Sequence, residues 1–364
     1  MADEVDIDAQ RDRFVEHLLG AVAGGIEILC VYVGDQLGLY RALAAGGPQR
    51  AAELAAAASV NARYAREWLE QQAMCGVVAV DDERASAQDR RYSLPPAHAE
   101  VLLDEKSLAY LAPMAQLVVA CARPLDALLE AFRSGTGVPY ASYGADLHEG
   151  QGRSTRPLFE SLLATRWLPA VPRIHERLQA NPPARVADVA CGLGYSSQAI
   201  ARGYTKVLVD GIDLDEASVA RARELLEGSD VAERVTFHHR DAAEIAFAGR
   251  YDLVTIFEAL HDMAHPTAVL RTLRGMLADG GSVLIGDERT AERFSLDAGD
   301  QERLYYGFSV LHCLPVGMTE PDSAGTGTLI RPDIVRDYAT EAGFVDVRVL
   351  PIEHDLWRFY LLSS

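Results

Sequence analysis

The chain is poor in basic residues relative to acidic ones. Its 364 residues include 34 Lys and Arg against 53 Asp and Glu, which gives a formal net charge of −19. Proteins that bind nucleic acids usually gather Lys and Arg on one face, because these side chains neutralise phosphates. The deficit therefore argues against a nucleic-acid partner.

Cysteines are also few, and they follow no ligand pattern. Neither a C-x-x-C pair nor another metal-binding spacing occurs among the five, which are Cys30, Cys75, Cys121, Cys191 and Cys313. Scattered cysteines of this kind are typical of reduced, buried thiols in a cytoplasmic protein.

Long apolar runs are scarce as well. The longest, 21–34, is interrupted by Glu27 and is shorter than the roughly 20 residues that cross a bilayer. The first residues, MADEVDIDAQRDRF, are acidic and polar, so no signal peptide is visible. We therefore expect a cytoplasmic protein without a membrane partner.

Enough apolar material is nevertheless present for two domains. Apolar residues make up 49% and charged residues 24% of the chain, which is an ordinary globular balance. Residues 11–45 repeat apolar side chains every three or four positions, and 51–60 and 62–78 are amphipathic. The segment 77–96 reads as two short strands around a polar loop. Helices followed by such a β-wing predict a winged-helix domain.

Within this pattern, residues 62–74 occupy the place of a DNA-recognition helix. This segment carries Arg63, Arg66, Glu67 and Glu70, whose charges nearly cancel. A helix that reads DNA would be expected to show excess positive charge. DNA reading is therefore not the function that this domain favours.

The middle of the chain, 97–180, reads as mostly helical apart from a Gly- and Tyr-rich loop at 134–144. This loop either faces a substrate through Tyr140 and Tyr143 or only connects domains. An Asn-Pro-Pro sequence at 181–183 ends the helical part. The expected divisions are a winged-helix domain at 1–125, linking helices with a pocket loop at 126–182, and a ligand-binding domain at 183–364.

Strands alternate with helices after residue 184. The expected strands are 185–190, 207–212, 234–238, 251–257, 282–287 and 345–350. This alternation predicts an α/β domain with a mainly parallel sheet and helices on both faces.

The first of these strands leads into a glycine-rich turn. Residues 186–197 read VADVACGLGYSS, with Asp188 inside the strand and Ala190, Gly192 and Gly194 in the turn. Glycines at such a turn let the backbone approach a ligand where a Cβ would clash. The acid precedes the glycines, which differs from the G-x-G-x-x-G fingerprint of dinucleotide folds.

Polar residues recur where the next strands end. Asp213 lies 19 residues after Gly194, close to the spacing at which α/β folds place an acid on ribose hydroxyls. The other reading of Asp213 is a helix cap. Asp241 follows the third strand, and Phe257 ends the fourth, at the crevice where open sheets bind ligands.

These motifs, with an L-x-x-G-G signature at 277–281, resemble those of the class I S-adenosylmethionine (SAM) methyltransferases. That family usually has a glycine where this chain has Ala190. The resemblance implies a Rossmann-like SAM-binding domain over 183–364, preceded by a mainly helical winged-helix domain. It also implies a set of cofactor-binding residues, namely Asp188, Ala190, Gly192, Gly194, Asp213, Leu214, Asp241, Ala242 and Phe257.

Roles within that set follow from the same resemblance. Asp213 would bind the ribose hydroxyls, and Leu214 would lie against the adenine. Asp241 would accept a hydrogen bond from the adenine amine, while Ala242 would supply backbone contacts.

The N-terminal half resembles the dimerisation domain of the same enzymes, so the resemblance covers nearly the whole chain. It implies a homodimer that acts on a small-molecule acceptor. A SAM-binding regulator that uses the winged helix remains an alternative.

Two residues past the fourth strand suggest a catalytic group. His261 and Asp262 lie in ALHDMAHPTAVL, and plant-type O-methyltransferases have an L-H-D segment here whose His is the general base. The pKa of an unperturbed imidazole is about 6.5, so this group can accept a phenol proton at neutral pH. Asp287 matches one of that family's carboxylates, whereas Ile330 falls where the second would be.

A second histidine, His312 in SVLHCLPVGM, widens the choice of chemistry. The arrangement also looks like the bacterial α-keto acid C-methyltransferases, in which two histidines hold a metal that chelates the substrate. That resemblance implies that His261 and His312 hold Fe, Zn or Ni, which would stabilise an enolate. The alternative reading of His312 is a buried histidine that donates to a carbonyl.

The leading interpretation is thus a SAM-dependent methyltransferase of secondary metabolism that C-methylates an α-keto acid with a metal. The close rival is O-methylation of a phenolic or other hydroxyl with His261 as the base.

Overall fold

A computed structural model describes residues 6–242 and 249–363 of the chain. The chain forms two compact units, Met1–Val119 and Ala120–Ser364. The division falls six residues before the predicted end of the winged-helix domain at 125, and the predicted linking region 126–182 lies inside the second unit.

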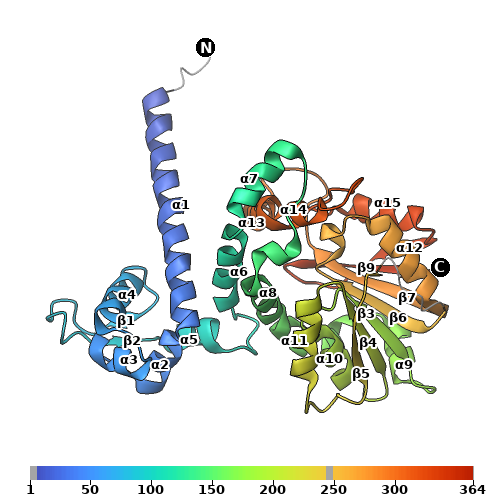
Figure 1. The fold of residues 1–364 in the computed structure, drawn as a ribbon, viewed down its shortest axis with the longest axis horizontal. Helices are drawn as coiled ribbons and strands as arrows, with labels where there is room; N and C mark the ends of the chain where they lie inside the picture. Colours follow the sequence, from blue (N-terminus) through green and yellow to red (C-terminus); the bar gives the residue numbers. More distant parts are fainter. Residues whose placement is uncertain (1–5, 243–248, 364) are drawn as a thin grey trace. The chain divides into compact units, whose positions relative to one another are not determined.

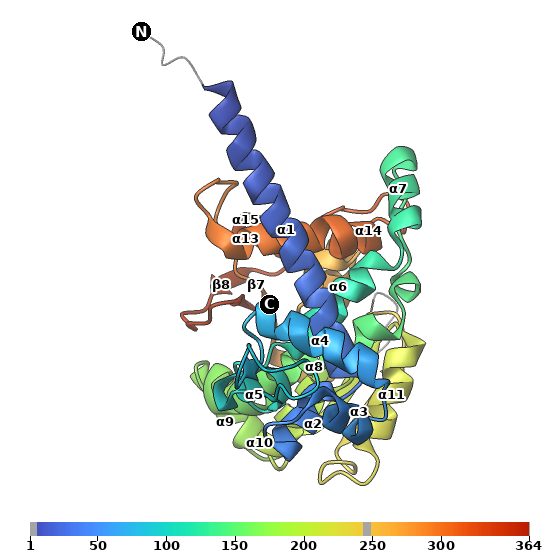
Figure 2. The same cartoon turned by 90° about the vertical axis from the view of Figure 1, so that its left-hand side faces the viewer.

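The first unit contains the predicted winged-helix arrangement. Its elements are α1 (Ile7–Gln36), α2 (Leu39–Gly46), α3 (Ala51–Ala57), α4 (Ala62–Met74), β1 (Ala79–Val80), β2 (Tyr92–Ser93) and α5 (Pro96–Leu103). Asn61 starts α4 because its side chain accepts a hydrogen bond from the Arg63 backbone N–H at 2.9 Å. The core of the unit gathers α2, α3 and α4 around the C-terminal end of α1, as Figures 1 and 2 show.

Helix α1 extends well beyond the apolar run that the sequence shows. It has 30 residues, and its most apolar window of 18 residues has a mean hydropathy of 1.7 with 6% of that window buried. By length and composition this helix is able to cross a membrane, although a mostly buried core helix of a soluble protein and a signal sequence near the N-terminus pass the same test. The bent pair Ala112–Ala122 and Leu125–Ser134 passes only when both helices are taken together.

Helices precede the sheet in the second unit. They are α6 (Ala112–Ala122, which crosses the division between the units), α7 (Leu125–Ser134), η1 (Tyr140–Tyr143), α8 (Ala145–Leu158), η2 (Phe159–Trp167) and α9 (Pro172–Gln179). The Tyr-rich loop contacts a later segment, because Tyr143 Oη donates to the Leu311 carbonyl and the Val138 N–H donates to the Pro315 carbonyl, each at 2.9 Å. The loop is therefore part of the second unit's packing.

A seven-stranded sheet forms the centre of the second unit, with the order β5-β4-β3-β6-β7-β9-β8. The strands are β3 (Arg185–Val189), β4 (Leu208–Asp213), β5 (Val235–His239), β6 (Tyr251–Phe257), β7 (Leu277–Glu288), β8 (Asp346–Val349) and β9 (Trp357–Ser363). The first five in spatial order are parallel, and β9 is antiparallel to both β7 and β8. The predicted mainly parallel α/β sheet is confirmed, whereas β9 was not predicted.

Helices cover both faces of this sheet (Figure 1). The remaining helices are α10 (Tyr195–Gly203), α11 (Glu216–Leu226), η4 (Leu260–Asp262), α12 (Pro266–Met276), α13 (Gly299–Phe308), η5 (Ser309–Cys313), α14 (Leu314–Gly317) and α15 (Pro332–Glu341). Neighbouring strand residues alternate between two cores, since Val186 packs with α10 and α11 while Ala187 packs with α12 and α15. Both cores lie on the faces of the sheet, and open sheets of this kind bind ligands at the carboxyl ends of their strands.

Candidate functional site

The glycine-rich turn after β3 adopts backbone conformations that favour glycine. Gly194, which caps the start of α10, has φ +77°, and a methyl group on it would overlap the Phe237 ring. Gly192 has φ +50° with open space beside it. Ala190 has φ +55°, so it holds the left-handed conformation despite its Cβ. The turn thus has the glycine-favouring backbone that a cofactor loop needs, and its contact with a cofactor stays a prediction.

Asp188 holds this turn in place. Its Oδ2 accepts hydrogen bonds from Ser196 Oγ at 2.5 Å and Ser197 Oγ at 2.6 Å, and its Oδ1 accepts from Thr255 Oγ1 at 2.7 Å. Burial raises the pKa of this carboxyl, and the three hydroxyl donors oppose the shift. The carboxylate therefore ties β3 to the first turn of α10 and to β6, and its predicted cofactor contact stays a prediction.

Asp213 stands at the end of β4, next to the turn. Its Oδ2 accepts a hydrogen bond from the Gly192 N–H at 2.8 Å, and its Oδ1 accepts one from the Asp215 N–H at 2.9 Å. The cap of α11 is Asp215, which accepts from the Ser218 N–H at 2.7 Å. Asp213 is therefore not the helix cap, and it lies where the ribose of SAM is expected, with exposed Leu214 beside it.

The other predicted cofactor residues differ in their surroundings. Asp241 and Ala242 are partly buried and follow β5, and 243–248 lie outside the described residues. The Phe257 ring is 7% exposed and packs against Phe159 and Trp357 at ring-centre distances of 5.3 and 6.0 Å. Because this ring belongs to an aromatic core, only the backbone of Phe257 remains available to a cofactor.

Helix α8 lies at the carboxyl ends of these strands, within the region that the sequence predicted to be helical, although the sequence did not single out its site-facing residues. His148 Nδ1 lies 3.4 Å from Asp215 Oδ2, and Gln151 Nε2 donates to Glu258 Oε2 at 2.7 Å. Gly152 packs so closely on Leu193 of the glycine turn that a Cβ would overlap that side chain. The helix thus connects the ends of β4 and β6 above the cofactor turn.

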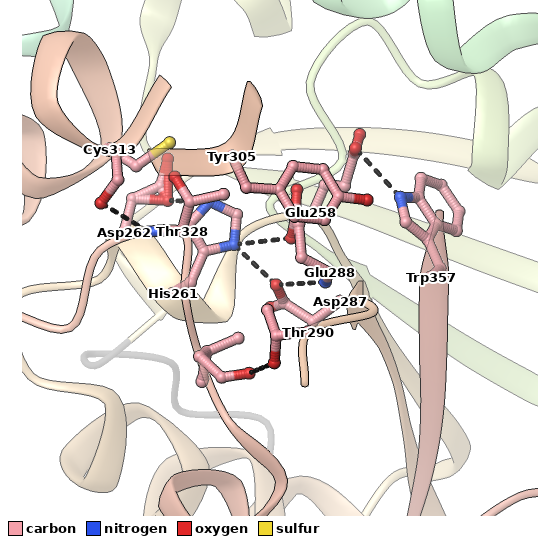
Figure 3. A network of polar contacts seen from close by, with 12 residues as sticks. Glu258, His261, Asp262, Asp287, Glu288, Thr290, Tyr305, Cys313, Thr328 and Trp357 are labelled. Atoms are coloured by element: carbon pink, nitrogen blue, oxygen red, sulfur yellow. Dashed lines mark hydrogen bonds and ion pairs between the residues drawn. The ribbon is translucent and has the colours of Figure 1, made fainter. Parts of the chain in front are cut away.

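His261 is the centre of a buried polar cluster (Figure 3). It is 3% exposed, and its Nδ1 lies 2.6 Å from Asp287 Oδ1 and 3.1 Å from Glu288 Oε2. Its Nε2 lies 3.4 Å from Asp262 Oδ1. The ring therefore has carboxyl groups at both nitrogens.

Glu288 supplies the carboxyl group that the sequence pattern lacked. Ile330, at the position where the plant-type family has its second carboxylate, is fully buried in the apolar core. Glu288 reaches His261 from the residue after Asp287 at the end of β7. The consecutive acids in LIGDE were the available sequence signal.

Charges in this cluster shift one another's pKa values. Burial alone would lower the pKa of His261, but the charges of Glu288, Asp287 and Asp262 outweigh it and raise that pKa well above its usual value. Burial raises the pKa of Glu288 strongly and that of Asp262 to about 6, against the opposing charge of His261. The pKa of Asp287 is lowered, since the charge of His261 and hydrogen bonds overcome the effect of burial. The His261–Asp287 pair is therefore ionised at neutral pH.

Glu258 is a further acid that the sequence prediction missed. It follows β6 with φ +49°, a conformation that costs a non-glycine residue free energy. Its carboxylate accepts hydrogen bonds from Gln151 and, at 3.0 Å, from Trp357 Nε1. Burial raises its pKa to about 7, although the Trp357 hydrogen bond opposes that shift.

His312 belongs to η5, and aromatic rings from an earlier segment surround its side chain. Its ring centre is 4.7 Å from that of Tyr143 and 5.9 Å from that of Tyr140, which in turn stacks on His148 at 5.1 Å. Burial, and then the charge of His261, lower the pKa of His312 to about 3. His312 is therefore neutral at physiological pH.

The predicted metal pair finds little support in this geometry. Two groups of metal-capable side chains surround His261 among the described residues, one with Asp262 and Cys313 and one with Asp287 and Glu288. His312 belongs to neither group, and His261 Nδ1 is engaged by Asp287. The structure thus does not bring both predicted histidines to one three-ligand site, and metal binding stays a prediction.

Taken together, the sheet order, the glycine turn after β3, the acid at the end of β4 and the histidine after β6 define a class I SAM-dependent methyltransferase domain. Residues 186–281 match the family described as a methyltransferase domain, and residues 11–103 match the Rv2258c-like winged HTH domain. The chain therefore carries a methyltransferase domain preceded by a winged-helix domain, as the resemblance predicted.

Known relatives cover the chain only in part. A 27-O-demethylrifamycin SV methyltransferase of Amycolatopsis mediterranei is 30% identical over 150 residues, which are 40% of this chain and 52% of that protein. A ubiquinone biosynthesis O-methyltransferase of Marinobacter nauticus is 34% identical over 170 residues, or 46% and 65% of the two chains. This chain thus spans less than two thirds of the length of these curated relatives.

Solved structures resemble the chain over nearly its full length. The mitomycin 7-O-methyltransferase MmcR is 19% identical, with a TM-score of 0.69 over 98% of this chain and 100% of that one. Human N-acetylserotonin methyltransferase in complex with SAM is 16% identical, with a TM-score of 0.69 over 100% and 99% of the chains. At these identities the likeness shows the fold.

Proposed function

We propose that the protein transfers the methyl group of SAM to a hydroxyl group of a small molecule, in secondary metabolism. The observation that carries this proposal is His261, buried after β6 with its Nδ1 held by Asp287. The names of two relatives, a 27-O-demethylrifamycin SV methyltransferase and a ubiquinone biosynthesis O-methyltransferase, support methylation of oxygen.

The geometry indicates how the residues divide the work. SAM supplies a methyl group activated by its sulfonium. The glycine turn and Asp213 hold it, and buried surroundings exclude water from the acceptor. When neutral, His261 donates from Nδ1 to Asp287 and accepts the acceptor's hydroxyl proton at Nε2. SAM, when bound, would give its methyl group to that oxygen and would leave as S-adenosylhomocysteine.

A turnover assay with a panel of phenols, other hydroxyl compounds and keto acids tests the function directly. We expect S-adenosylhomocysteine to form with hydroxyl acceptors, and His261→Ala to retain SAM binding while it loses about a hundredfold or more in kcat. Turnover of keto acids alone would instead support the metal-assisted C-methylation that the sequence suggested. No turnover with any acceptor, despite SAM binding, would contradict the proposal.

We also propose that the protein is a homodimer joined through α1. Apolar side chains of this helix are exposed, as in Phe14 at 63%, Leu18 at 52% and Ile26 at 55%. Monomeric soluble proteins rarely leave large contiguous apolar surfaces in water. A second copy of the chain would cover this surface.

The second candidate function is regulation through DNA binding by the winged-helix domain, since residues 11–103 match a winged HTH domain. Its α4 carries little net positive charge, because Arg63 pairs with Glu67 and Glu70 offsets the charge of Arg66. A gel shift with genomic DNA fragments at low salt tests this candidate. Binding at submicromolar concentration would support it, and its absence would end it.

A further inference from the structure

A pocket lies where the end of β7, the start of β9 and the first turn of α13 meet. Its volume is about 510 Å³, within the range of roughly 300–1,000 Å³ that is usual for sites of small molecules. The lining residues are Arg289, Thr290, Ala291, Gln301, Asp355 and Arg358. They are separate from the acids around His261 and from the predicted cofactor residues, so this pocket has no role in the function proposed above.

Hydrogen bonds fix the walls of this pocket. Gln301 Nε2 donates to the Asp355 carbonyl at 2.8 Å and to Tyr305 Oη at 2.7 Å. Tyr305 Oη and the Arg289 backbone N–H both donate to the Leu356 carbonyl, each at 2.7 Å. These contacts join α13, the residue after β7 and the segment before β9. The pocket therefore has a defined shape before any ligand enters.

Two arginines give the pocket a positive charge. Neither Arg289 nor Arg358 forms an ion pair with a carboxylate within the described ranges, and Arg289 Nη1 donates to the His354 carbonyl at 2.9 Å. Asp355 is the one acid among the lining residues. Two guanidinium groups thus face one carboxylate, on a chain whose formal net charge is −19.

Arg358 is the more buried of the two arginines. Its Nη1 is buried and has no hydrogen-bond partner in the described part of the chain. Its side chain also interacts with Tyr360, whose pKa burial raises to about 12 although the charge of Arg358 opposes that shift. The phenol is therefore neutral at physiological pH, and it does not neutralise the charge of Arg358.

We propose that this pocket binds an oxyanion, the carboxylate or phosphate group of a small organic molecule, between Arg289 and Arg358. Guanidinium groups present paired N–H donors that match the oxygens of these anions. A bound oxyanion would give Arg358 Nη1 an acceptor, and a buried donor without an acceptor costs free energy. A cationic ligand would meet two guanidinium groups and is not expected to bind.

Calorimetry with three related compounds tests this proposal. Phenyl phosphate, benzoate and benzyl alcohol share an aromatic ring and differ in the charge of the attached group. The protein is first saturated with S-adenosylhomocysteine, so that no compound binds in the cofactor site. We expect both anions to bind about tenfold or more tightly than the alcohol, the range of a hydrogen bond to a charged group. Equal affinity for the alcohol, or no binding of either anion, would overturn the proposal.

Substitutions place the anion in this pocket. Arg289→Gln and Arg358→Gln should each raise the Kd for phenyl phosphate about tenfold or more. The control is Arg303→Gln on α13, which removes the same charge outside the pocket from a side chain that is 78% exposed and pairs with Asp300. Arg289 is exposed, so its variant decides the test if Arg358→Gln does not fold. An unchanged Kd in Arg289→Gln would place the anion elsewhere and overturn the proposal.

The bound anion could come from the methyl acceptor or from a separate effector, and kinetics distinguish these sources. If phenyl phosphate raises KM for acidic acceptors and not for neutral ones, the pocket holds an anionic group of the acceptor. If it binds without changing either KM, the pocket holds a separate molecule. Both results support an anion site. The calorimetry needs no turnover, so a failure of hydroxyl methylation leaves this proposal standing, and loss of anion binding leaves hydroxyl methylation standing.

Discussion

At the scale of single residues, Gly194 is the position where a methyl group should do most harm. Its φ of +77° disfavours any side chain, and a Cβ would overlap the Phe237 ring. We expect Gly194→Ala to lower the free energy of unfolding by about 2–3 kcal/mol and to weaken SAM binding, as measured by denaturation and calorimetry. The matched control is Gly192→Ala, where φ is also positive but the space is open, so its cost should be smaller.

His261 gives a prediction about pH. Its raised pKa keeps the imidazole protonated at neutral pH, so the share able to accept a proton grows as pH rises. We expect kcat to increase from neutral into alkaline pH. Asp287→Asn removes an anion beside Nδ1, which lowers the pKa of His261 and moves the midpoint of the profile to lower pH. A midpoint that stays in place would show that another group limits the rate.

At the scale of elements, Asp188 joins β3, α10 and β6 through three hydroxyl donors. Asp188→Ala would leave these buried hydroxyls without their acceptor, at a cost of about 3 kcal/mol or more in the free energy of unfolding. Ser197→Ala removes only one donor and should cost about 1 kcal/mol. Chemical denaturation measures both. Equal costs would mean that the serines find other acceptors.

The elements that the sequence predicted are those with local patterns. Alternating strands and helices predicted β3 to β8, and the structure brings the glycine turn and Asp213 together. Strand β9 was missed because it is antiparallel and has no following helix, so no alternation signals it. The sequence did not indicate the contacts of Glu258 with Gln151 and Trp357. These contacts join residues 107 and 99 positions apart, and no local spacing in the sequence encodes them.

At the scale of the whole molecule, the prediction concerns α1. Its exposed apolar surface supports the proposed homodimer, which predicts a mass in solution of twice the 39.5 kDa of one chain. The double substitution Leu18→Glu and Ile26→Glu places charges in that interface. Each apolar side chain buried in the interface contributes about 1.5–3 kcal/mol to the free energy of dimerisation. The dissociation constant of the dimer should therefore rise at least about a hundredfold.

Light scattering at micromolar protein concentration distinguishes the outcomes. The double variant should be monomeric and keep its SAM affinity, whereas Glu16→Gln, also on α1 but already polar and exposed, should remain dimeric. A monomeric wild type that sediments with lipid vesicles would contradict the homodimer. In that case the length and apolar composition of α1 would serve a bilayer, and its exposed side chains would contact lipid instead of a second chain.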